Sequence, residues 1–535
     1  MTLSFRVPRF LFRESKSRFA LAVVSGTGAG TLAGALVALL QRASLVERPS
    51  LWLAAVFGAL CVLQIALNWT SRISLQRLLH DVALPQMRRR LVDRFLDADL
   101  RALERAGDAR LIGALTEDTA QTGFAATGWT YAARSATAMI ACLAYMVWLS
   151  TSLLALAAGA IAVGACVSYV LLRPARHRAQ RAREAQERTM GYVEDLVLGT
   201  KELKMSSAVR EGFLTRAFEP SVRMMHREQA ISASLQTLSA SWTSVALLAA
   251  VGVLLFTRGA APATAPVIGY AFALVYLGTE VATMFAVVPL IRTGELAFAS
   301  LEKLDLFSER DASEPHAASP ASAFDRLDLR AVTWSYRVGD ATDFVLGPIE
   351  LTLRAGEIVF FVGGNGSGKS TLAKVVAGLY APENGAVAIG DRAEPAEEHR
   401  SRFSAVLSKW HLFDRLYGID ATDLDARARG YLDDLELGGK VKVEGGAFST
   451  LDLSQGQRKR LALVTALLED RPVYVFDEWA ADQDPQFKEA FYRRILPDLK
   501  RRGKTAIVVT HDDRYFDAAD RVIRLERGKV VDGAR

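Results

Sequence analysis

The sequence has 535 residues, 50% of them hydrophobic, and a mean hydropathy of +0.15. This average is too apolar for an ordinary water-soluble protein, and the apolar residues concentrate before residue 300. A net charge of +6 and a pI near 9.1 could suggest a nucleic-acid partner. However, the basic residues flank apolar stretches. We therefore expect them to lie beside the bilayer, where anionic lipid headgroups attract positive charge. We expect the lipid bilayer, and no nucleic acid, as a partner.

The apolar half predicts six membrane-spanning helices. Five apolar stretches occur, at Phe19–Leu40, Ser50–Ser71, Ser135–Leu172, Ser241–Thr257 and Val267–Ile291. A crossing of about 30 Å of hydrocarbon needs about 20 residues, and the third stretch is nearly twice that length. It therefore predicts a hairpin of two spans that turns near residues 150–152.

Basic residues are distributed unevenly between the loops. They gather before the first span, after the second and after the fourth, whereas the opposite loops hold only Arg42, Arg48 and Arg258. Because an excess of arginine and lysine marks cytoplasmic loops, both termini are predicted to be cytoplasmic. The loops after the second and fourth spans carry helical periodicity, and we expect them to extend the membrane helices into the cytoplasm.

Glu280 is the one strong acid inside a predicted span. A charge is costly in lipid, so either a role in cargo binding or gating, or simple pairing with a basic residue or cavity water, is open. The three cysteines, Cys61, Cys142 and Cys166, also fall in predicted spans without a CxxC pair. Neither a disulfide nor a metal site is expected from them.

A segment rich in alanine, serine, proline and charge, residues 308–323, predicts a linker. It divides the chain into a membrane domain, 1–307, and a second domain, 324–535. The first strong motif of the second domain follows the apolar run Ile358–Val362, which predicts a buried parallel strand.

This motif has the P-loop spacing GxxxxGK[ST]. Glycines allow backbone N–H groups to turn toward a phosphate chain, and the following helix adds the positive end of its dipole. Lys369 can reach the β- and γ-phosphates of ATP, and Ser370 can ligate Mg²⁺. The loop residues predicted to bind nucleotide are Gly363, Gly364, Asn365, Gly366, Ser367, Gly368, Lys369, Ser370 and Thr371.

Two further strands predict the rest of a hydrolytic site. The run Val473–Phe476 ends in two adjacent acids, of which Asp477 suits a role in holding Mg²⁺ and Glu478 can orient or deprotonate an attacking water. The run Thr505–Thr510 delivers His511, whose imidazole can contact a γ-phosphate. Glu478 and His511 are the predicted catalytic residues.

The segment Leu453-Ser-Gln-Gly-Gln457 is similar to the LSGGQ signature of the ATP-binding cassette family, with Gln455 in place of a glycine. With the P-loop, the acid pair and the histidine, it makes residues 325–535 resemble this family. The resemblance implies an all-α six-span transmembrane domain joined to an α/β P-loop NTPase domain. Because the family needs two P-loops and two signatures, it also implies a homodimer with two ATP sites.

The resemblance further assigns nucleotide contacts to single residues. Ser454 and Gly456 would contact the γ-phosphate of ATP held on the P-loop of a second subunit. Tyr336 looks like the aromatic residue that stacks on adenine, in preference to Trp334. The remaining residues of the implied nucleotide site are Gln455, Gln457 and Asp484. Short transverse helices that rest on the ATPase domain would lie near Leu103–Thr116 and Leu203–Phe213.

The chain departs from the family pattern at two places. Ser408 occupies the position of the Q-loop glutamine that touches Mg²⁺, and the resemblance places it with Ser370 and Asp477 among the expected metal residues, although serine is shorter than glutamine. Trp479-Ala-Ala-Asp-Gln-Asp484 replaces the usual segment after the catalytic acid. Both departures resemble the bacterial cyclic-peptide and siderophore-peptide exporter group. This implies ATP-driven export of an amphipathic peptide across the inner membrane. A lipid or lipid-linked glycan flippase and a non-transporting ATP-binding regulator are the alternatives.

Overall fold

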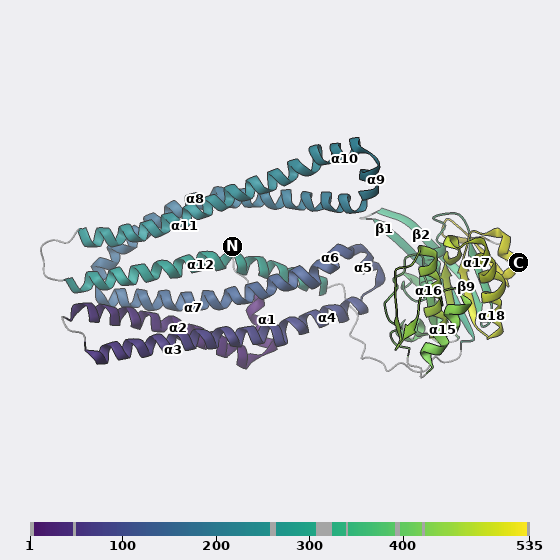
Figure 1. Cartoon of the computed structure of the whole chain (residues 1–535), viewed down its shortest axis with the longest axis horizontal. Coiled ribbons are helices and arrows are strands. Elements are labelled where there is room, and N and C mark those ends of the chain that lie inside the picture. Colours follow the sequence, from purple (N-terminus) through teal and green to yellow (C-terminus); the bar gives the residue numbers. More distant parts are fainter. Residues whose placement is uncertain are drawn as a thin grey trace. The chain divides into compact units, whose positions relative to one another are not determined.

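The computed structural model describes residues 5–46, 50–256, 264–305, 324–338, 341–390, 396–419 and 423–531 (Figure 1). The chain divides into two compact units, which we describe separately. The first comprises Met1–Arg94 and Ala109–Leu306, and the second comprises Phe95–Asp108 and Phe307–Arg535. The second unit therefore includes a segment from the predicted loop between the second and third spans. The predicted linker, 308–323, lies outside the described residues.

The first unit is built from helices. In chain order they are α1 (Arg6–Glu14), α2 (Lys16–Leu45), α3 (Leu51–Leu78), α4 (Leu84–Asp97), α6 (Asp108–Gly113), α7 (Thr119–Leu149), α8 (Thr151–Leu198), α9 (Thr200–Met205), α10 (Ser207–Phe213), α11 (Glu219–Phe256) and α12 (Thr264–Asp305). Single π-helical turns at Leu79–Ala83, Ala114–Asp118 and Leu214–Phe218 continue α3 into α4, α6 into α7 and α10 into α11.

Four helical segments of the described chain are long and apolar enough to cross a membrane, at Lys16–Leu45, Leu51–Asp97, Arg110–Leu149 and Val267–Lys303. They contain the first, second, third and sixth predicted spans. The extended backbone of Ser150 separates α7 from α8, as the predicted hairpin requires. The fourth and fifth predicted spans fall on α8 and α11, where residue 257 and many side chains lie outside the described residues. The count of six stays a prediction.

Small residues allow the helices of the first unit to pack closely. A Cβ atom on Gly30 of α2 would lie 2.5 Å from the backbone oxygen of Arg134 in α7, and one on Gly294 of α12 would lie 2.3 Å from the Cβ of Ala125 in α7. Close approach of this kind drives helix association where lipid removes most of the hydrophobic driving force. Figure 1 shows α2, α7 and α12 alongside one another, and α8 and α11 as a long antiparallel pair.

Two arginine–glutamate pairs link the long helices. Arg134 of α7 places its two terminal nitrogens 3.1 and 2.9 Å from the carboxylate of Glu280 in α12. Arg178 of α8 lies 2.8 Å from Glu228 of α11. Glu280 is only 3% exposed, and such burial of a charge requires a partner. Of the two roles left open for Glu280, the structure therefore shows pairing with a basic residue.

The second unit is an α/β domain whose described residues form three sheets, two of them large. The antiparallel sheet has the order β2-β1-β4, formed by Ala341–Arg354, Arg326–Val338 and Asn384–Ile389. The larger sheet has the order β11-β10-β3-β9-β8-β5 and is parallel except between β10 and β11. Its strands are β3 (Ile358–Val362), β5 (Phe403–Val406), β8 (Val473–Asp477), β9 (Thr505–Val509), β10 (Arg521–Glu526) and β11 (Lys529–Val531). The prediction that β3, β8 and β9 are buried strands is confirmed, since every residue in them is buried.

Helices pack against the larger sheet. They are α13 (Lys369–Val376), α14 (Ala396–Ser401), α15 (Leu424–Asp434), α16 (Gln455–Glu469), α17 (Pro485–Ala490) and α18 (Leu496–Arg501). Two short strands, β6 (Val443–Glu444) and β7 (Ala447–Phe448), pair with each other. A continuous apolar core that includes Phe360, Phe476 and Val508 packs the sheet against these helices.

A short helix from the loop between the second and third spans, α5 (Leu100–Ala106), is part of the second unit. Its Arg101 lies 2.7 Å from Glu383, and its guanidinium carbon is 5.1 Å from the ring centroid of Trp334. Its Glu104 accepts hydrogen bonds from Lys374 at 3.0 Å and Tyr380 at 2.5 Å. α5 thus overlaps the start of the predicted transverse segment 103–116, and residues 109–116 belong to the first unit. The second predicted segment, 203–213, falls on α9 and α10, which are also in the first unit.

Candidate functional site

The carboxyl ends of four neighbouring parallel strands bring the predicted hydrolytic residues to one edge of the sheet. β3 leads into the P-loop, β9 into Thr510 and His511, β8 ends in the acid pair, and β5 leads to Ser408. Ligands of open α/β sheets bind at this edge, because loops and helix N-termini converge there. The topology therefore assembles residues that lie more than one hundred positions apart.

The backbone of the P-loop has the form that phosphate binding requires. Gly366 has φ +74° and Gly368 has φ +100°, conformations that residues with a side chain rarely adopt. A Cβ on Gly368 would also lie 2.7 Å from the ring of Phe344. Gly368 is the N-cap of α13, so the free N–H groups of that helix begin within the loop. The loop can therefore present a series of N–H donors to an anion.

Lys369 is buried beneath this loop with its ammonium turned onto the loop backbone. Its Nζ donates to the carbonyl oxygens of Gly363 at 3.0 Å and Gly364 at 2.9 Å. Burial lowers the pKa of the Lys369 ammonium, and the nearby carboxylates of Glu478 and Asp477 oppose that shift. Within the described chain, the buried hydroxyl of Ser367 has no hydrogen-bond partner. A buried cation and an unsatisfied donor beside a glycine loop fit the polyphosphate of ATP.

Asp477 is fully buried at the end of β8. One carboxylate oxygen accepts from the Ser370 hydroxyl at 2.9 Å, and the other accepts from the backbone N–H of Ser408 at 3.3 Å. Among the described residues no group of three or more His, Cys, Asp or Glu side chains could hold a metal by itself. A hydroxyl and one carboxylate instead fit Mg²⁺, which keeps water and substrate oxygens as ligands. The contact of Ser408 with Asp477 is made by its backbone N–H, and a role of Ser408 in holding Mg²⁺ stays a prediction.

Glu478 and His511 face each other at the same edge of the sheet. The His511 Nε2 atom lies 2.9 Å from Glu478 Oε1, and the two side chains are 41% and 38% exposed. Glu478 has φ +53°, an unusual backbone conformation for a residue with a side chain and one that is found preferentially at functional sites. A half-exposed carboxylate fixed by a histidine can orient or deprotonate a water molecule.

The signature residues form a second cluster with the segment that follows Glu478. Ser454 and Gln457 exchange hydrogen bonds as a capping box at the start of α16. The Gln455 amide donates to Asp482 at 3.2 Å, and the Gln483 amide donates to the backbone oxygen of Gly456 at 3.1 Å. Within the described chain, no hydrogen bond of Ser454, Gln455 or Gln457 reaches the P-loop. The structure therefore groups the signature with Asp482–Asp484 rather than with the hydrolytic residues of the same chain.

Two basic residues that the sequence analysis missed hold this second cluster together. Lys459 lies 2.7 Å from Asp482 and donates to the backbone oxygen of Glu478 at 3.0 Å. Arg460 lies 2.7 Å from Asp484. A signal was present, because Lys459 follows Gln455 by one helical turn and therefore lies on the same face of α16. Only the fold shows that the acids of the 482–484 segment approach that face.

The two aromatic candidates for adenine stacking differ in exposure. Trp334 is 2% exposed and stacks on Tyr380 with ring centroids 4.6 Å apart, so it belongs to the core. Tyr336 is 48% exposed. The preference for Tyr336 over Trp334 is consistent with this difference, and stacking of Tyr336 on adenine stays a prediction.

Apolar helices of membrane length occur together with an α/β domain that carries a P-loop, a buried acid suited to Mg²⁺, a hydrogen-bonded histidine–glutamate pair and a signature helix. This combination defines an ATP-driven membrane transporter. Comparisons with known proteins agree. The sequence model of the family described as ABC transporter matches residues 346–481. The ATP-binding protein SyrD of Pseudomonas syringae pv. syringae is 34% identical over 84% of this chain and 82% of its own length. The chain belongs to the ABC transporter family.

Two further relatives bear on the transported molecule. The ATP-dependent lipid A-core flippase of Alkalilimnicola ehrlichii is 28% identical over 73% of this chain and 68% of its own length. The probable syringafactin export ATP-binding/permease protein SyfD of Pseudomonas syringae pv. syringae is 30% identical over 38% of this chain and 33% of its own length. The protein is thus a bacterial membrane exporter that binds and hydrolyses ATP, and the predicted combination of a helical membrane domain with an α/β P-loop domain is confirmed.

Proposed function

We propose that the protein exports an amphipathic peptide, cyclic or made without ribosomes, such as a siderophore peptide, from the cytoplasm across the inner membrane. The observation that carries this proposal is the pair of departures from the family pattern. Ser408 contacts Asp477 through its backbone, and Asp482 contacts the substituted signature residue Gln455. Both departures are thus built into an otherwise complete site, as expected for features of a subgroup. The similarity to the syringafactin exporter supports the same cargo class.

The proposed active unit is a homodimer in which each chain supplies a six-span domain (1–307), a linker (308–323) and an ATPase domain (324–535), with both termini in the cytoplasm. The chain contains one P-loop and one signature. In the described chain the signature residues bind the 482–484 segment and leave the P-loop uncovered. A second copy would place its Ser454 and Gly456 on the γ-phosphate of ATP held by the first. When both ATP sites close, the two ATPase domains would pull the cytoplasmic helix extensions toward each other. The membrane cavity would then open outward.

Hydrolysis in this proposal depends mainly on positioning. Lys369 and the P-loop N–H groups bind the phosphates, and Ser370 and Asp477 hold Mg²⁺, which neutralises charge on the phosphate oxygens when bound. Glu478 orients or deprotonates the water, and His511 fixes Glu478 and contacts the γ-phosphate. Gln455, Gln457 and Asp484 support the signature contacts, and Tyr336 stacks on adenine. Cleavage of ATP separates the two ATPase domains and resets the transporter.

Transport into inside-out vesicles tests the cargo. Vesicles that contain the full-length protein should accumulate a radiolabelled cyclic amphipathic peptide when ATP and Mg²⁺ are supplied. ATP with EDTA, and a nucleotide analogue that resists hydrolysis, are the controls and should support no uptake. Peptide uptake that is equal with and without hydrolysable nucleotide would contradict the proposal.

A second candidate function is a lipid or lipid-linked glycan flippase, which the similarity to the lipid A-core flippase favours. The same vesicles distinguish the two functions, because a flippase would move a fluorescent phospholipid between leaflets and its ATPase would respond to lipid and not to peptide. The third interpretation, a non-transporting regulator whose cassette binds ATP but cycles poorly, depends on Ser408 in place of the Q-loop glutamine. Membership of a transporter family argues against it.

A further inference from the structure

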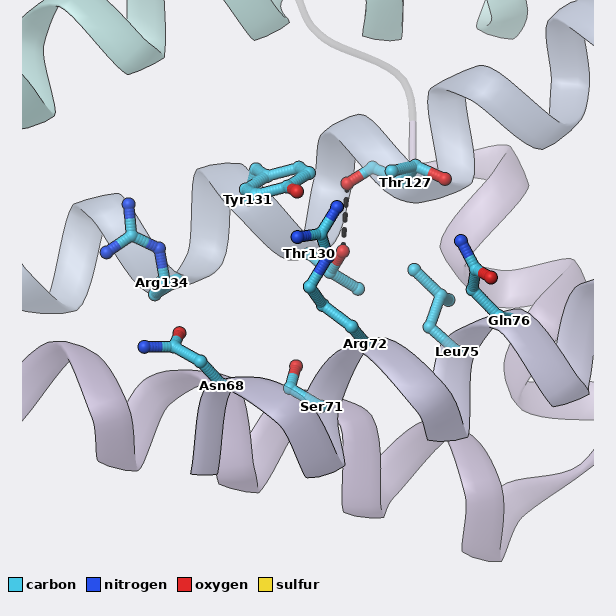
Figure 2. Close-up of a pocket in the computed structure, with 9 residues that line it drawn as sticks. All are labelled: Asn68, Ser71, Arg72, Leu75, Gln76, Thr127, Thr130, Tyr131 and Arg134. Atoms are coloured by element: carbon cyan, nitrogen blue, oxygen red, sulfur yellow. Dashed lines mark hydrogen bonds between the residues drawn. The ribbon is translucent and has the colours of Figure 1, made fainter. Parts of the chain in front are cut away.

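The first unit contains a small polar pocket between α3 and α7. Its volume is about 50 Å³, and eight of the nine residues that line it are polar or charged. Figure 2 shows side chains from the two helices converging on it, with Arg72 reaching from α3 toward Thr130 and Tyr131 of α7. A water molecule needs only about 10–15 Å³ of such volume, so the pocket can hold a group the size of a carboxylate.

The pocket lies at the cytoplasmic edge of the predicted membrane spans. Arg72 directly follows the predicted second span, 50–71, and Arg134 directly precedes the third, which begins at Ser135. An amphipathic molecule in the inner leaflet places its polar end at this depth. A positive charge here is costly unless it has an anionic partner or reaches the headgroup region, and charges of this kind commonly mark substrate pathways.

The charge of the pocket is not balanced. Arg134 is neutralised by its bidentate contact with Glu280. Arg72, by contrast, has no ion-pair or hydrogen-bond partner among the described residues. Its guanidinium carbon lies 5.7 Å from the ring centroid of Tyr131, a cation–π distance that holds the group in the pocket. One net positive charge therefore remains available to an anion.

Neutral donors surround this charge. Asn68, Arg72 and Gln76 follow one another at intervals of four residues and so share one face of α3. In the described chain the amides of Asn68 and Gln76 and the hydroxyl of Tyr131 have no hydrogen-bond partner. The hydroxyl of Ser71 differs, because it donates to the backbone oxygen of Ala22 at 2.6 Å and is therefore satisfied. The unused donors of the pocket all lie around Arg72.

We propose that this pocket binds a carboxylate of the amphipathic peptide cargo before export. The proposal rests on the proposed function, because it takes the cargo to be a peptide. A carboxylate offers two coplanar oxygens that match the guanidinium fork, and its single charge equals the net charge of the pocket. Asn68 and Gln76 supply further donors to the same oxygens. An anionic lipid headgroup would be attracted by the same charge, and the experiment below separates the two.

The test measures ATPase stimulation of the full-length protein in phosphatidylcholine vesicles. The probes are two N-dodecanoyl peptides of identical sequence, one ending in a carboxylate and one in a carboxamide. The Arg72→Gln variant should raise the half-maximal concentration of the carboxylate peptide about tenfold, which corresponds to about 1.4 kcal/mol of lost binding free energy. It should leave the carboxamide peptide unaffected. The Arg72→Lys variant keeps the charge but lacks the planar guanidinium, so its half-maximal concentration should lie between those of wild type and Arg72→Gln. It also provides the test if Arg72→Gln fails to fold.

Arg77→Gln is the matched control, because Arg77 lies on the same helix, is exposed, has no partner within the described chain and does not line the pocket. It should behave as wild type with both peptides. Equal shifts for both peptides, or equal effects of Arg72→Gln and Arg77→Gln, would overturn the carboxylate site and leave the exporter function intact. Stimulation by phosphatidylglycerol alone, lost in Arg72→Gln, would assign the pocket to lipid and overturn the proposal. Wild-type protein that neither transports nor responds to any peptide would overturn the proposed function, and the carboxylate site with it.

Discussion

Replacement of Glu478 by glutamine separates the chemical step from nucleotide binding. The substitution keeps the size of the side chain and one oxygen that can meet His511 Nε2, which lies 2.9 Å away. It removes the negative charge and the ability to accept a proton from water. The phosphate contacts of Lys369 and the P-loop do not involve the Glu478 side chain, so ATP should bind with an affinity close to that of wild type.

The expected loss of turnover is large and the expected loss of stability is small. A positioned general base contributes about 10²–10⁴-fold, or about 2.7–5.4 kcal/mol of barrier. The Glu478 and His511 side chains are 38% and 41% exposed, and a polar side-chain contact with that exposure contributes at most about 1 kcal/mol to folding. For a domain of this size, 1 kcal/mol corresponds to about 2–4 °C in Tm. Hydrolysis should therefore fall by at least about 100-fold with little change in Tm.

The assay combines steady-state phosphate release, binding of a fluorescent ATP analogue and thermal unfolding on the same vesicle preparation. Glu489→Gln is the control, since Glu489 is an exposed acid outside the site, with an ion-pair distance of 3.8 Å to Arg493. It should hydrolyse ATP at the wild-type rate. Hydrolysis by Glu478→Gln at a rate close to wild type would refute the assignment of the base. A parallel loss of nucleotide binding would show that the residue acts in binding instead.

Three other predictions concern contacts that the structure reveals. In a double-mutant cycle, Gln455→Ala and Asp482→Ala should show non-additive losses of ATPase activity, with a coupling of about 0.5–1 kcal/mol, and purely additive losses would mean that the 3.2 Å contact has no role. Glu104→Gln should lower transport more than basal ATPase activity, because it weakens the contacts of α5 with Lys374 and Tyr380. Arg105→Gln, on the same helix but without a partner in the described chain, should change neither activity. Equal effects of the two substitutions would argue against coupling through α5. Glu280→Gln should destabilise the detergent-solubilised protein by about 3–5 kcal/mol, because it leaves the Arg134 charge unpaired. The double variant Arg134→Met with Glu280→Met should recover most of that loss. A double variant as unstable as the single one would contradict the ion-pair account.

The sequence predicts the hydrolytic site well because its parts are local. A glycine loop after a buried strand, or an acid pair at a strand end, is recognisable from a few adjacent residues, and parallel strands bring such ends to one edge. The contacts of Lys459 were not predicted, and for Glu104 and Glu280 the sequence indicated a contact or a pairing but not the partners, Lys374 and Tyr380 for Glu104 and Arg134 for Glu280. Each contact joins residues whose separation along the chain carries no periodic signal, so a charged residue on a helix looks the same in the sequence whether it is solvated or paired. Only the packing of the elements decides between these possibilities.

The missed contacts also give the proposed dimer a way to link its two sites. Lys459 holds the backbone oxygen of Glu478 and the carboxylate of Asp482, and the Trp479 indole donates to the backbone oxygen of Lys459 at 2.8 Å. The segment from Glu478 to Asp482 is therefore fastened to α16 by main-chain and side-chain contacts. In the proposed arrangement the start of α16 binds the ATP of the other copy through Ser454. Any shift of α16 on that ATP must then move the backbone of Glu478, so each site would sense whether the opposite site is filled.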